Sequence, residues 1–411
     1  MKRYAPQTLN ALFLVAGTCI GGGMLALPVA TAPNGFLPSL GVMVLAWLAM
    51  TTTALFLVEA GFWMKKDEAH LISMTERLLG RSGKIAAWIL YLFIAYASLI
   101  AYTAGGGMLL YGASCTFNCS QFTKEMGCLV FTLLFGSVIF FNHKVLARLN
   151  SSLFFVMIIV YLLLISLAVP KIEMTLLLRQ EWSTSWLCLP IFLTAFSFQT
   201  MVPSLHPFLD HHAPSIRVAI VGGTFIAFLV YLIWQATVLG SVPATGPDGL
   251  MSAFTEGQVA TYVLGKAVNS GLIELFATTF AFFALVTSYL GIAMGLYDFL
   301  SDGCKIPKSG WGNIALGGLI VLPTLYGSIL FERVFVSALD ATGGFGDALL
   351  NGIIPALMII AGRYYYKHRK TEFQMIGGKW LLVMALIFYL SALGIEITSR
   401  LGYVLPVHTV D

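Results

Sequence analysis

Charged residues are scarce in this chain. Only 10% of its 411 residues are Asp, Glu, Lys or Arg, whereas 58% are hydrophobic and the mean hydropathy is +0.86. A soluble globular domain has roughly a quarter charged residues, so the composition excludes that class and predicts a polytopic protein embedded in a lipid bilayer. The net charge of +4 comes from basic residues that flank apolar runs, which predicts no nucleic-acid partner.

The chain also lacks sequences that would separate domains or bind ATP. No linker, low-complexity stretch or charge block separates parts of the sequence, so residues 1–411 are expected to form a single membrane domain. No GxxxxGK loop occurs, which argues against direct use of ATP. The first apolar run has no small-residue cleavage site and is expected to be a retained helix. Of the six cysteines, only Cys115 and Cys119 are close, and they form a disulfide only if their loop faces an oxidising space.

Apolar runs of roughly 20 residues predict about eleven membrane-spanning helices. They are expected at 8–31, 37–63, 85–112, 125–141, 151–169, 185–209, 216–240, 271–300, 312–331, 334–361 and 380–399. With a cytoplasmic N-terminus, 17 of the 23 Lys and Arg residues fall in cytoplasmic segments and 6 fall outside. The positive-inside rule therefore predicts that the N-terminus lies in the cytoplasm and the C-terminus outside.

Two of these runs are interrupted in the middle by residues that break helices. The first contains GTCIGGG at residues 17–23, closely followed by Pro28, and the sixth contains FSFQTMVPS at residues 196–204. Such a break frees backbone polar groups that lipid cannot satisfy, so they must face protein, an ion or a solute. Paired breaks in two halves of a chain indicate the central site of a secondary transporter.

The spacing of the breaks also predicts the topology. Five helices separate the starts of the two broken runs, so a second five-helix unit would be inverted relative to the first. The expected units are 8–169 and 185–361, and the helix at 380–399 is an addition.

The broken segments and several others resemble a known family. The motifs are GTCIGGGMLALP at 17–28, FSFQTMVPSL at 196–205, YTAGGG at 102–107, VTSYLG at 286–291, LYDFL at 296–300 and GGFG at 343–346. They are similar to the hydroxy and aromatic amino acid permeases of bacteria, including tyrosine-specific and tryptophan-specific permeases, in the amino acid/polyamine/organocation superfamily. The resemblance covers essentially the whole chain.

This resemblance implies an all-α, LeuT-type permease with eleven spans, a 5+5 inverted repeat and broken helices 1 and 6. It further implies import of an aromatic amino acid across the bacterial inner membrane by proton symport, without a cofactor. Tyrosine is the substrate we expect, and tryptophan or phenylalanine are the alternatives.

An amino acid substrate brings a carboxylate and an ammonium to the bilayer midplane, where an isolated charge is expensive. Amide groups at the start of a helix favour an anion, so we expect Gly21, Gly22 and Gly23 to bind the carboxylate, with Thr18 and the Tyr102 hydroxyl as helpers. The alternative for the glycines is tight helix packing. Carbonyl groups left free at Ala16 and Gly17 in the first break, and at Ala195 and Phe196 in the second, would accept hydrogen bonds from the ammonium. Ile20 is a further residue expected at the substrate.

The second break adds side chains to this hypothetical site. Phe198 is expected to pack on the substrate ring, and Ser197 and Gln199 are polar residues in an apolar span. Gln199 would bond a phenolic hydroxyl, because a site built for a hydroxyl discriminates against the analogue that lacks it. Hydrogen bonds between helices are the alternative role for both polar residues.

Coupling to an ion gradient requires oxygen ligands or a titratable group. Thr287 and Ser288 would suit sodium, a hard cation. Asp340 and Asp347 lie seven residues apart on one helix face, and Asp347 is favoured as the proton carrier or gate. In some proton-coupled relatives of this architecture a lysine in the fifth span replaces the sodium site, and the fifth run of this chain contains none. This departure from the resemblance leaves the coupling ion open between proton and sodium. Three further carboxylates are expected to be solvated near span ends, namely Glu59, Glu274 and Asp298.

Two other classes of protein fit the sequence less well. His206, Asp210, His211 and His212 contain zinc-ligand types and would be the centre of a membrane-embedded metalloenzyme, although a solvated helix end is the expected role of this segment. A channel would need a continuous polar lining, and no run has a polar stripe.

Overall fold

The computed structural model describes most of the chain, and all secondary structure in the described part is helical. The described residues are 5–64, 70–116, 121–137, 143–256, 258–330, 334–368 and 372–402.

The spans follow the predicted apolar runs closely. Their helices are α1 (Ala5–Cys19), η1 (Gly22–Leu25), α2 (Leu27–Thr31), α3 (Phe36–Phe62), α4 (Leu71–Thr116), α5 (Lys124–Gly136), α6 (His143–Ala168), α8 (Leu189–Ala195), η5 (Gln199–Met201), α9 (Val202–Phe208), α10 (Ala213–Ser241), α13 (Gly271–Cys304), α14 (Gly310–Leu330), α15 (Val334–Ala341), η6 (Thr342–Ile353), α16 (Ile354–Ile360), η7 (Ala361–Tyr365) and α17 (Gly378–Arg400). Short helices in the connections are η3 (Val169–Lys171), α7 (Met174–Leu177), η4 (Ser185–Cys188), α11 (Leu250–Glu256) and α12 (Ala260–Ala267).

Within the described residues, nine helices are long and apolar enough to cross a membrane, and the bent pair Pro6–Cys19 and Gly22–Thr31 makes a tenth span. The remaining predicted span, 125–141, coincides with α5. That helix has 13 residues up to Gly136, and residues 138–142 lie outside the described part of the chain. The predicted all-helical membrane architecture is thus confirmed.

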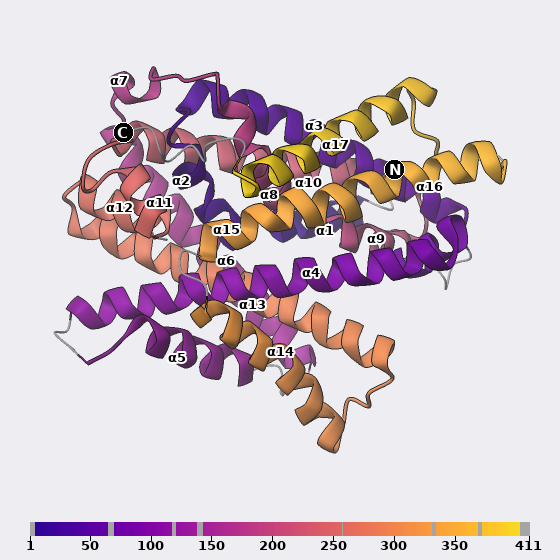
Figure 1. Ribbon diagram of the computed structural model, residues 1–411, viewed down its shortest axis with the longest axis horizontal. Coiled ribbons are helices and arrows are strands. Elements are labelled where there is room, and N and C mark those ends of the chain that lie inside the picture. Colours follow the sequence, from indigo (N-terminus) through magenta and orange to yellow (C-terminus); the bar gives the residue numbers. More distant parts are fainter. Residues whose placement is uncertain are drawn as a thin grey trace.

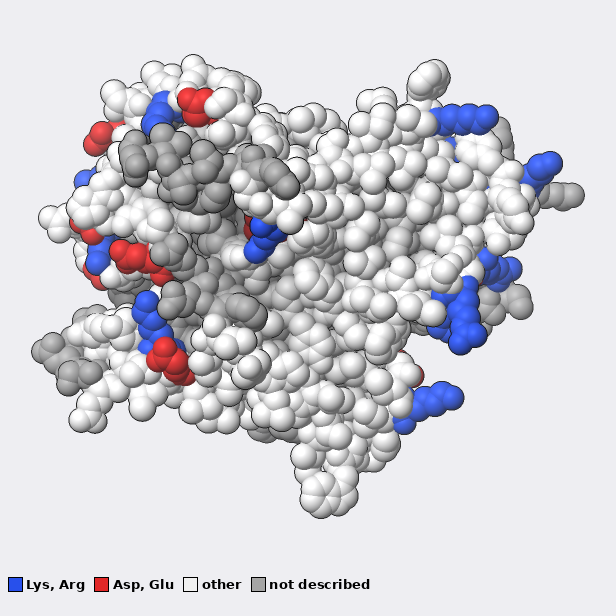
Figure 2. All heavy atoms as spheres, viewed as in Figure 1, with Lys and Arg blue, Asp and Glu red and all other residues white. Residues whose placement is uncertain are grey.

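The long helices run roughly parallel to one axis of the molecule (Figure 1). In this view α5 and α14 lie on one side of α4, and α15, α16 and α17 lie on the other. Charged side chains gather toward the two ends of that axis, and the belt between them is mostly uncharged (Figure 2). Large apolar side chains are exposed on the spans themselves, including Leu133 of α5 and Phe155 and Leu162 of α6. An apolar belt between polar ends is the surface that a bilayer requires.

The first predicted break is present. The helix ladder stops at Cys19 and restarts at Gly22, and the two parts are bent by 45°. Gly21 between them is fully extended, with φ −167° and ψ −155°. Pro28 lies in the first turn of α2, where a missing N–H costs nothing because those amides have no helical partner anyway.

The second predicted break is present as well. Helix α8 ends at Ala195, residues 196–198 are irregular, and the helix resumes through η5 and α9. Phe198 has φ −147° and ψ 0°, outside the helical range. Pro203 occupies the first turn of α9, as Pro28 does in α2. Both restarts therefore use proline where it is tolerated in a helix.

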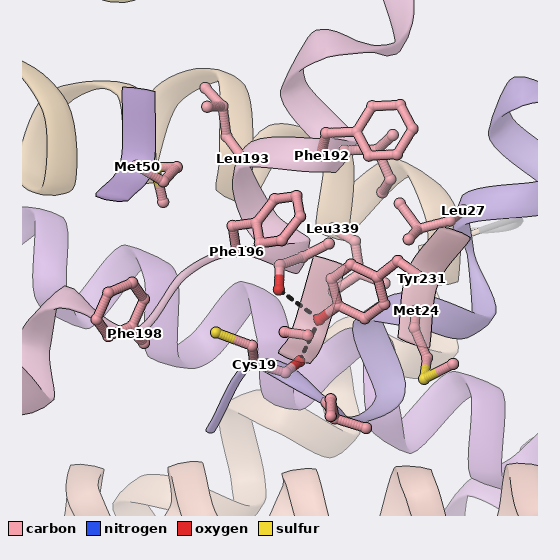
Figure 3. Packing of buried hydrophobic residues seen from close by; sticks show 14 of the residues in the cluster. Cys19, Met24, Leu27, Met50, Phe192, Leu193, Phe196, Phe198, Tyr231 and Leu339 are labelled. Atoms are coloured by element: carbon pink, nitrogen blue, oxygen red, sulfur yellow. Dashed lines mark hydrogen bonds between the residues drawn. The ribbon is translucent and has the colours of Figure 1, made fainter. Parts of the chain in front are cut away.

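Helix α10 supports both breaks from one side. The Tyr231 hydroxyl lies 2.6 Å from the Cys19 carbonyl oxygen and 2.7 Å from that of Ala195, and Figure 3 shows these two contacts among the buried side chains around the breaks. Trp234 donates its indole N–H to the Met24 carbonyl at 3.0 Å. Carbonyl groups that leave a helix ladder inside a membrane must find donors, and α10 supplies them.

Candidate functional site

A cavity of about 500 Å³ lies where the two breaks meet. Its walls come from α1, α4, α6, α8, α13, η5 and η6. The lining residues are Phe13, Leu14, Gly17, Thr18, Cys19, Ile20, Gly21, Gly23, Tyr91, Ile94, Ala95, Ser98, Tyr102, Asn150, Ser151, Phe154, Thr194, Ser197, Thr200, Met201, Thr287, Ser288, Gly291, Ile292, Gly295 and Thr342. The volume is typical of a site for a small organic molecule, and so is the mixture of apolar walls with a few polar groups.

Among the described residues, the cavity reaches the surface on the side of α1. Its lining residues Thr18, in the last turn of α1, and Thr200, in η5, are exposed. On the side of α2, the space is filled by Met24, Leu27 and Phe192, each with 0% of its surface exposed. These three side chains pack around the breaks in Figure 3. A solute can therefore enter from the α1 side, whereas the other side is closed by the core.

The glycine-rich break contacts α13 and α4 closely. The Gly22 amide donates to Ser288 Oγ at 2.8 Å, and an added Cβ on Gly21 would overlap the same oxygen. A Cβ on Gly22 would lie 2.7 Å from Cε1 of the Tyr102 ring. Glycine is thus required at both positions by close approach, and Ser288 occupies one of the three amides expected to bind a carboxylate. Gly21 and Gly23 line the cavity directly.

One expectation about free carbonyl groups is wrong. The Ala16 carbonyl accepts from the Ile20 amide at 2.9 Å, because α1 continues to Cys19, and Ala16 does not line the cavity. The carbonyl ends that approach each other are those of Cys19 and Ala195, and Tyr231 contacts both. A hydroxyl has one proton, so it can donate to only one of the two at a time. Gly17 lines the cavity as expected of a site residue.

Residues of the second break divide between the cavity and the core. Ser197 lines the cavity, whereas Phe196, Phe198 and Gln199 are buried away from it with at most 1% of their surface exposed. The Gln199 amide donates to the Met50 carbonyl at 3.1 Å, and its oxygen accepts from the Phe198 amide at 2.9 Å. These contacts place Gln199 in the role of an interhelical hydrogen-bonding residue.

The ion-coupling candidates also lie in different places. Thr287 and Ser288 line the cavity, and the Thr287 hydroxyl donates within its own helix to the Phe283 carbonyl at 2.8 Å. Asp347 is fully buried beside Ser197. Asp340 lies further along the span and interacts with Glu396 of α17. The two aspartates therefore do not share one site.

Glu59 is not solvated, contrary to expectation. It has 1% of its surface exposed and receives two hydrogen bonds from the Arg363 guanidinium, at 2.6 and 2.5 Å. The Met375 amide adds a third at 2.7 Å. The ion pair connects α3 to the end of the tenth span. The sequence did not indicate this contact, because the two residues are far apart in the chain.

The histidine segment does not form a metal centre in the described part of the chain. No group of three His, Cys, Asp or Glu side chains converges there. The His206 ring packs edge-on against Phe62 at 4.9 Å between ring centroids. Cys115, at the end of α4, is an exposed cysteine without a disulfide, and Cys119 lies outside the described residues.

Two residues of interest were missed in the sequence. Asn351 follows Asp347 by four positions, which is the same helix face, so this spacing could have indicated it. Tyr231 had no comparable signal, because only the folded chain brings α10 to both breaks.

Comparison with known proteins agrees with this architecture. Residues 4–396 match the model of the tryptophan/tyrosine permease family. A tyrosine-specific transport system of Haemophilus influenzae is 29% identical over 97% of this chain and 98% of its own length, and a tryptophan-specific transport protein of Pseudomonas aeruginosa is 28% identical over 93% and 92%.

The solved structure of MhsT in complex with L-phenylalanine superposes with a TM-score of 0.62 at 15% identity, over 95% of this chain and 98% of that one. This similarity confirms the LeuT-type fold. Because the family model covers nearly the whole sequence, this chain belongs to the tryptophan/tyrosine permease family.

Proposed function

We propose that the protein is a secondary active transporter that imports an aromatic amino acid, tyrosine in the first instance, by proton symport. The observation that carries the proposal is the cavity at the meeting point of two helix breaks. Relatives named for tyrosine and tryptophan transport support the substrate class.

The distribution of charge supports an orientation in the membrane. The end of the molecule at which α9 and α16 lie is basic in Figure 2, and it corresponds to the segments that the positive-inside rule assigns to the cytoplasm. In a bacterial inner membrane the N-terminus would then be cytoplasmic, the C-terminus outside, and the cavity open to the cytoplasm. Import by alternating access would require a second state in which the packing of Met24, Leu27 and Phe192 opens instead.

The chemistry of the cavity suits an amino acid with a ring. The backbone at Gly21 and Gly23, next to the start of η1, provides a polar end for a carboxylate. Phe154 lies across from it with its ring against Gly17, 3.0 Å from the position of an added Cβ, and Tyr91 and Ile94 add apolar wall. We propose that the carboxylate lies at the first break and that the ring lies between α4 and α6.

The alternatives concern the substrate and the ion. Tryptophan or phenylalanine would fit the same walls, and sodium would bind near Thr287 and Ser288, whose hydroxyl groups suit a hard cation.

Purified protein in liposomes tests the proposal directly. Uptake of labelled tyrosine is measured under an imposed pH gradient and, separately, under a sodium gradient, with unlabelled tyrosine, tryptophan and phenylalanine as competitors. Accumulation driven by the pH gradient and inhibited most strongly by tyrosine is expected. Uptake that ignores both gradients would contradict symport, and stronger inhibition by tryptophan would reassign the substrate.

A further inference from the structure

A buried polar cluster lies next to the cavity, in contact with its lining residue Ser197. Asp347 and Asn351 of η6 are both 0% exposed. The Ser197 hydroxyl donates to Asp347 Oδ1 at 2.7 Å, and the Asn351 amide donates to the same oxygen at 2.6 Å. The Asn351 amide also lies 3.1 Å from Ser197 Oγ. Ser197 belongs to the second break and lines the cavity, so it joins the cluster to the substrate space.

Two oxygen atoms of this cluster are buried without any hydrogen-bond partner. They are Asp347 Oδ2 and Asn351 Oδ1. Among the described residues, no Lys, Arg or His nitrogen lies within 4.0 Å of Asp347. A buried carboxylate without a cation is strongly disfavoured inside a membrane. Binding one proton removes the charge and turns Oδ2 into a hydrogen-bond donor.

The described groups around η6 provide no free cation for Asp347. The titratable groups that face η6 are Tyr102 of α4, Tyr389 and Glu396 of α17, and Asp340 of α15. Glu59 of α3 is paired with Arg363, and helices α8 and α16 contain no titratable residue. Glu396 is bonded to Arg400 at 2.8 Å. The neutralising partner of Asp347 must therefore be a proton or a small cation from solution.

We propose that Asp347, with Asn351 and Ser197, is the site at which the coupling proton binds. This inference rests on the proposed function and deepens it. The proton comes from water that reaches the cavity, adds to the Asp347 carboxylate, and leaves as a proton on the other side of the membrane, so no other reactant is needed.

The position of the cluster explains how the proton acts on transport. Ser197 lies in the irregular segment where α8 ends, and an added Cβ on Gly343 would overlap the Pro190 carbonyl, so η6 and α8 touch backbone to backbone. Protonated Asp347 is stable in the buried arrangement seen here. Charged Asp347 needs water, which requires Ser197 and the second break to move. A proton thus shifts the balance between two states by its different affinity for them.

The test uses Asp347→Asn in liposomes, because asparagine keeps the shape and cannot release a proton. We expect it to exchange external labelled for internal unlabelled amino acid at a rate close to that of the unmodified protein. Accumulation driven by a pH gradient should fall to the level without a gradient. Asp302→Asn, the same change at an exposed carboxylate of α13, is the matched control and should keep gradient-driven accumulation.

Accumulation by Asp347→Asn at the unmodified level would overturn the proposal, and so would accumulation by the unmodified protein under a sodium gradient alone. Absence of exchange in the unmodified protein would instead refute the proposed function.

If the Asp347→Asn protein cannot be reconstituted in liposomes, the Asn351→Leu variant tests the proposal instead. Loss of one hydrogen bond to the charged form should move the midpoint of pH-dependent uptake upward by about one to two pH units. An unchanged midpoint would exclude this cluster as the proton site.

Discussion

Replacing Gly22 by alanine is expected to weaken substrate binding while the fold persists. A Cβ on Gly22 would lie 2.7 and 2.9 Å from two carbon atoms of the Tyr102 ring and 3.2 Å from a methyl group of Leu285. Native Cβ atoms essentially never approach another atom within 3.0 Å, so a neighbour must shift. Leu285 is fully buried, whereas the Tyr102 ring borders the cavity. The ring therefore has open space only where the substrate is proposed to bind.

The magnitude follows from the cost of overpacking. An extra methyl group in a filled interior costs about 1–3 kcal/mol. In the empty protein, rotation of the Tyr102 ring into the cavity relieves most of this strain. In the bound protein that space is taken, so the cost falls on the complex. Since about 1.4 kcal/mol changes an affinity tenfold, the substrate should bind roughly 5- to 150-fold more weakly.

The assay is equilibrium binding of a labelled aromatic amino acid to purified protein, with thermal unfolding measured on the same sample. Gly318→Ala on α14 is the matched control, because a Cβ there meets nothing within 4 Å. Gly22→Ala protein that binds as tightly as the control would refute the role of this close approach. A large loss of thermal stability would show that the ring does not relax into the cavity.

Three further predictions concern stability and orientation. Tyr231→Phe removes the hydroxyl beside two buried carbonyl groups and should destabilise the protein by about 1–3 kcal/mol, seen as a lower melting temperature; an unchanged melting temperature would contradict this. Glu59→Gln leaves the Arg363 guanidinium buried without its counter-charge and should cost about 3–5 kcal/mol, part of which Arg363→Met in the same chain should restore. With the other cysteines removed, a membrane-impermeant maleimide applied to intact cells should label Cys115 and leave Cys304 unlabelled, although both are exposed; the reverse pattern would invert the topology.

The sequence predicted the breaks because their cause is local. Glycine in GTCIGGG and proline at Pro28 and Pro203 act on their own backbone, so their effect does not depend on neighbours distant in the chain. Apolar runs likewise predict spans, because each helix that crosses the bilayer needs its own stretch of about 20 apolar residues. The prediction for Ala16 failed by one turn, because residues that can break a helix do not say where the last hydrogen bond forms.

Side-chain roles at the site were harder to predict. Gln199 and Ser197 are two residues apart, yet one is bonded to Met50 in the core and the other faces the cavity. In an irregular segment no helical period relates neighbouring side chains, so their directions depend on the helices packed around them. Glu59 shows the same limit, because its partner is 304 positions away.

Composition, the length of the apolar runs and the glycine and proline breaks were sufficient, by themselves, to define a helical membrane protein with two interrupted spans. Folding alone brought Tyr231 to the carbonyl ends of both breaks and placed a carboxylate of the tenth span against the hydroxyl of the sixth. The physical reason is the distance along the chain over which each interaction acts. Backbone preference and transfer into lipid act within a few residues, whereas burial and hydrogen bonding at a site depend on which distant segments pack together.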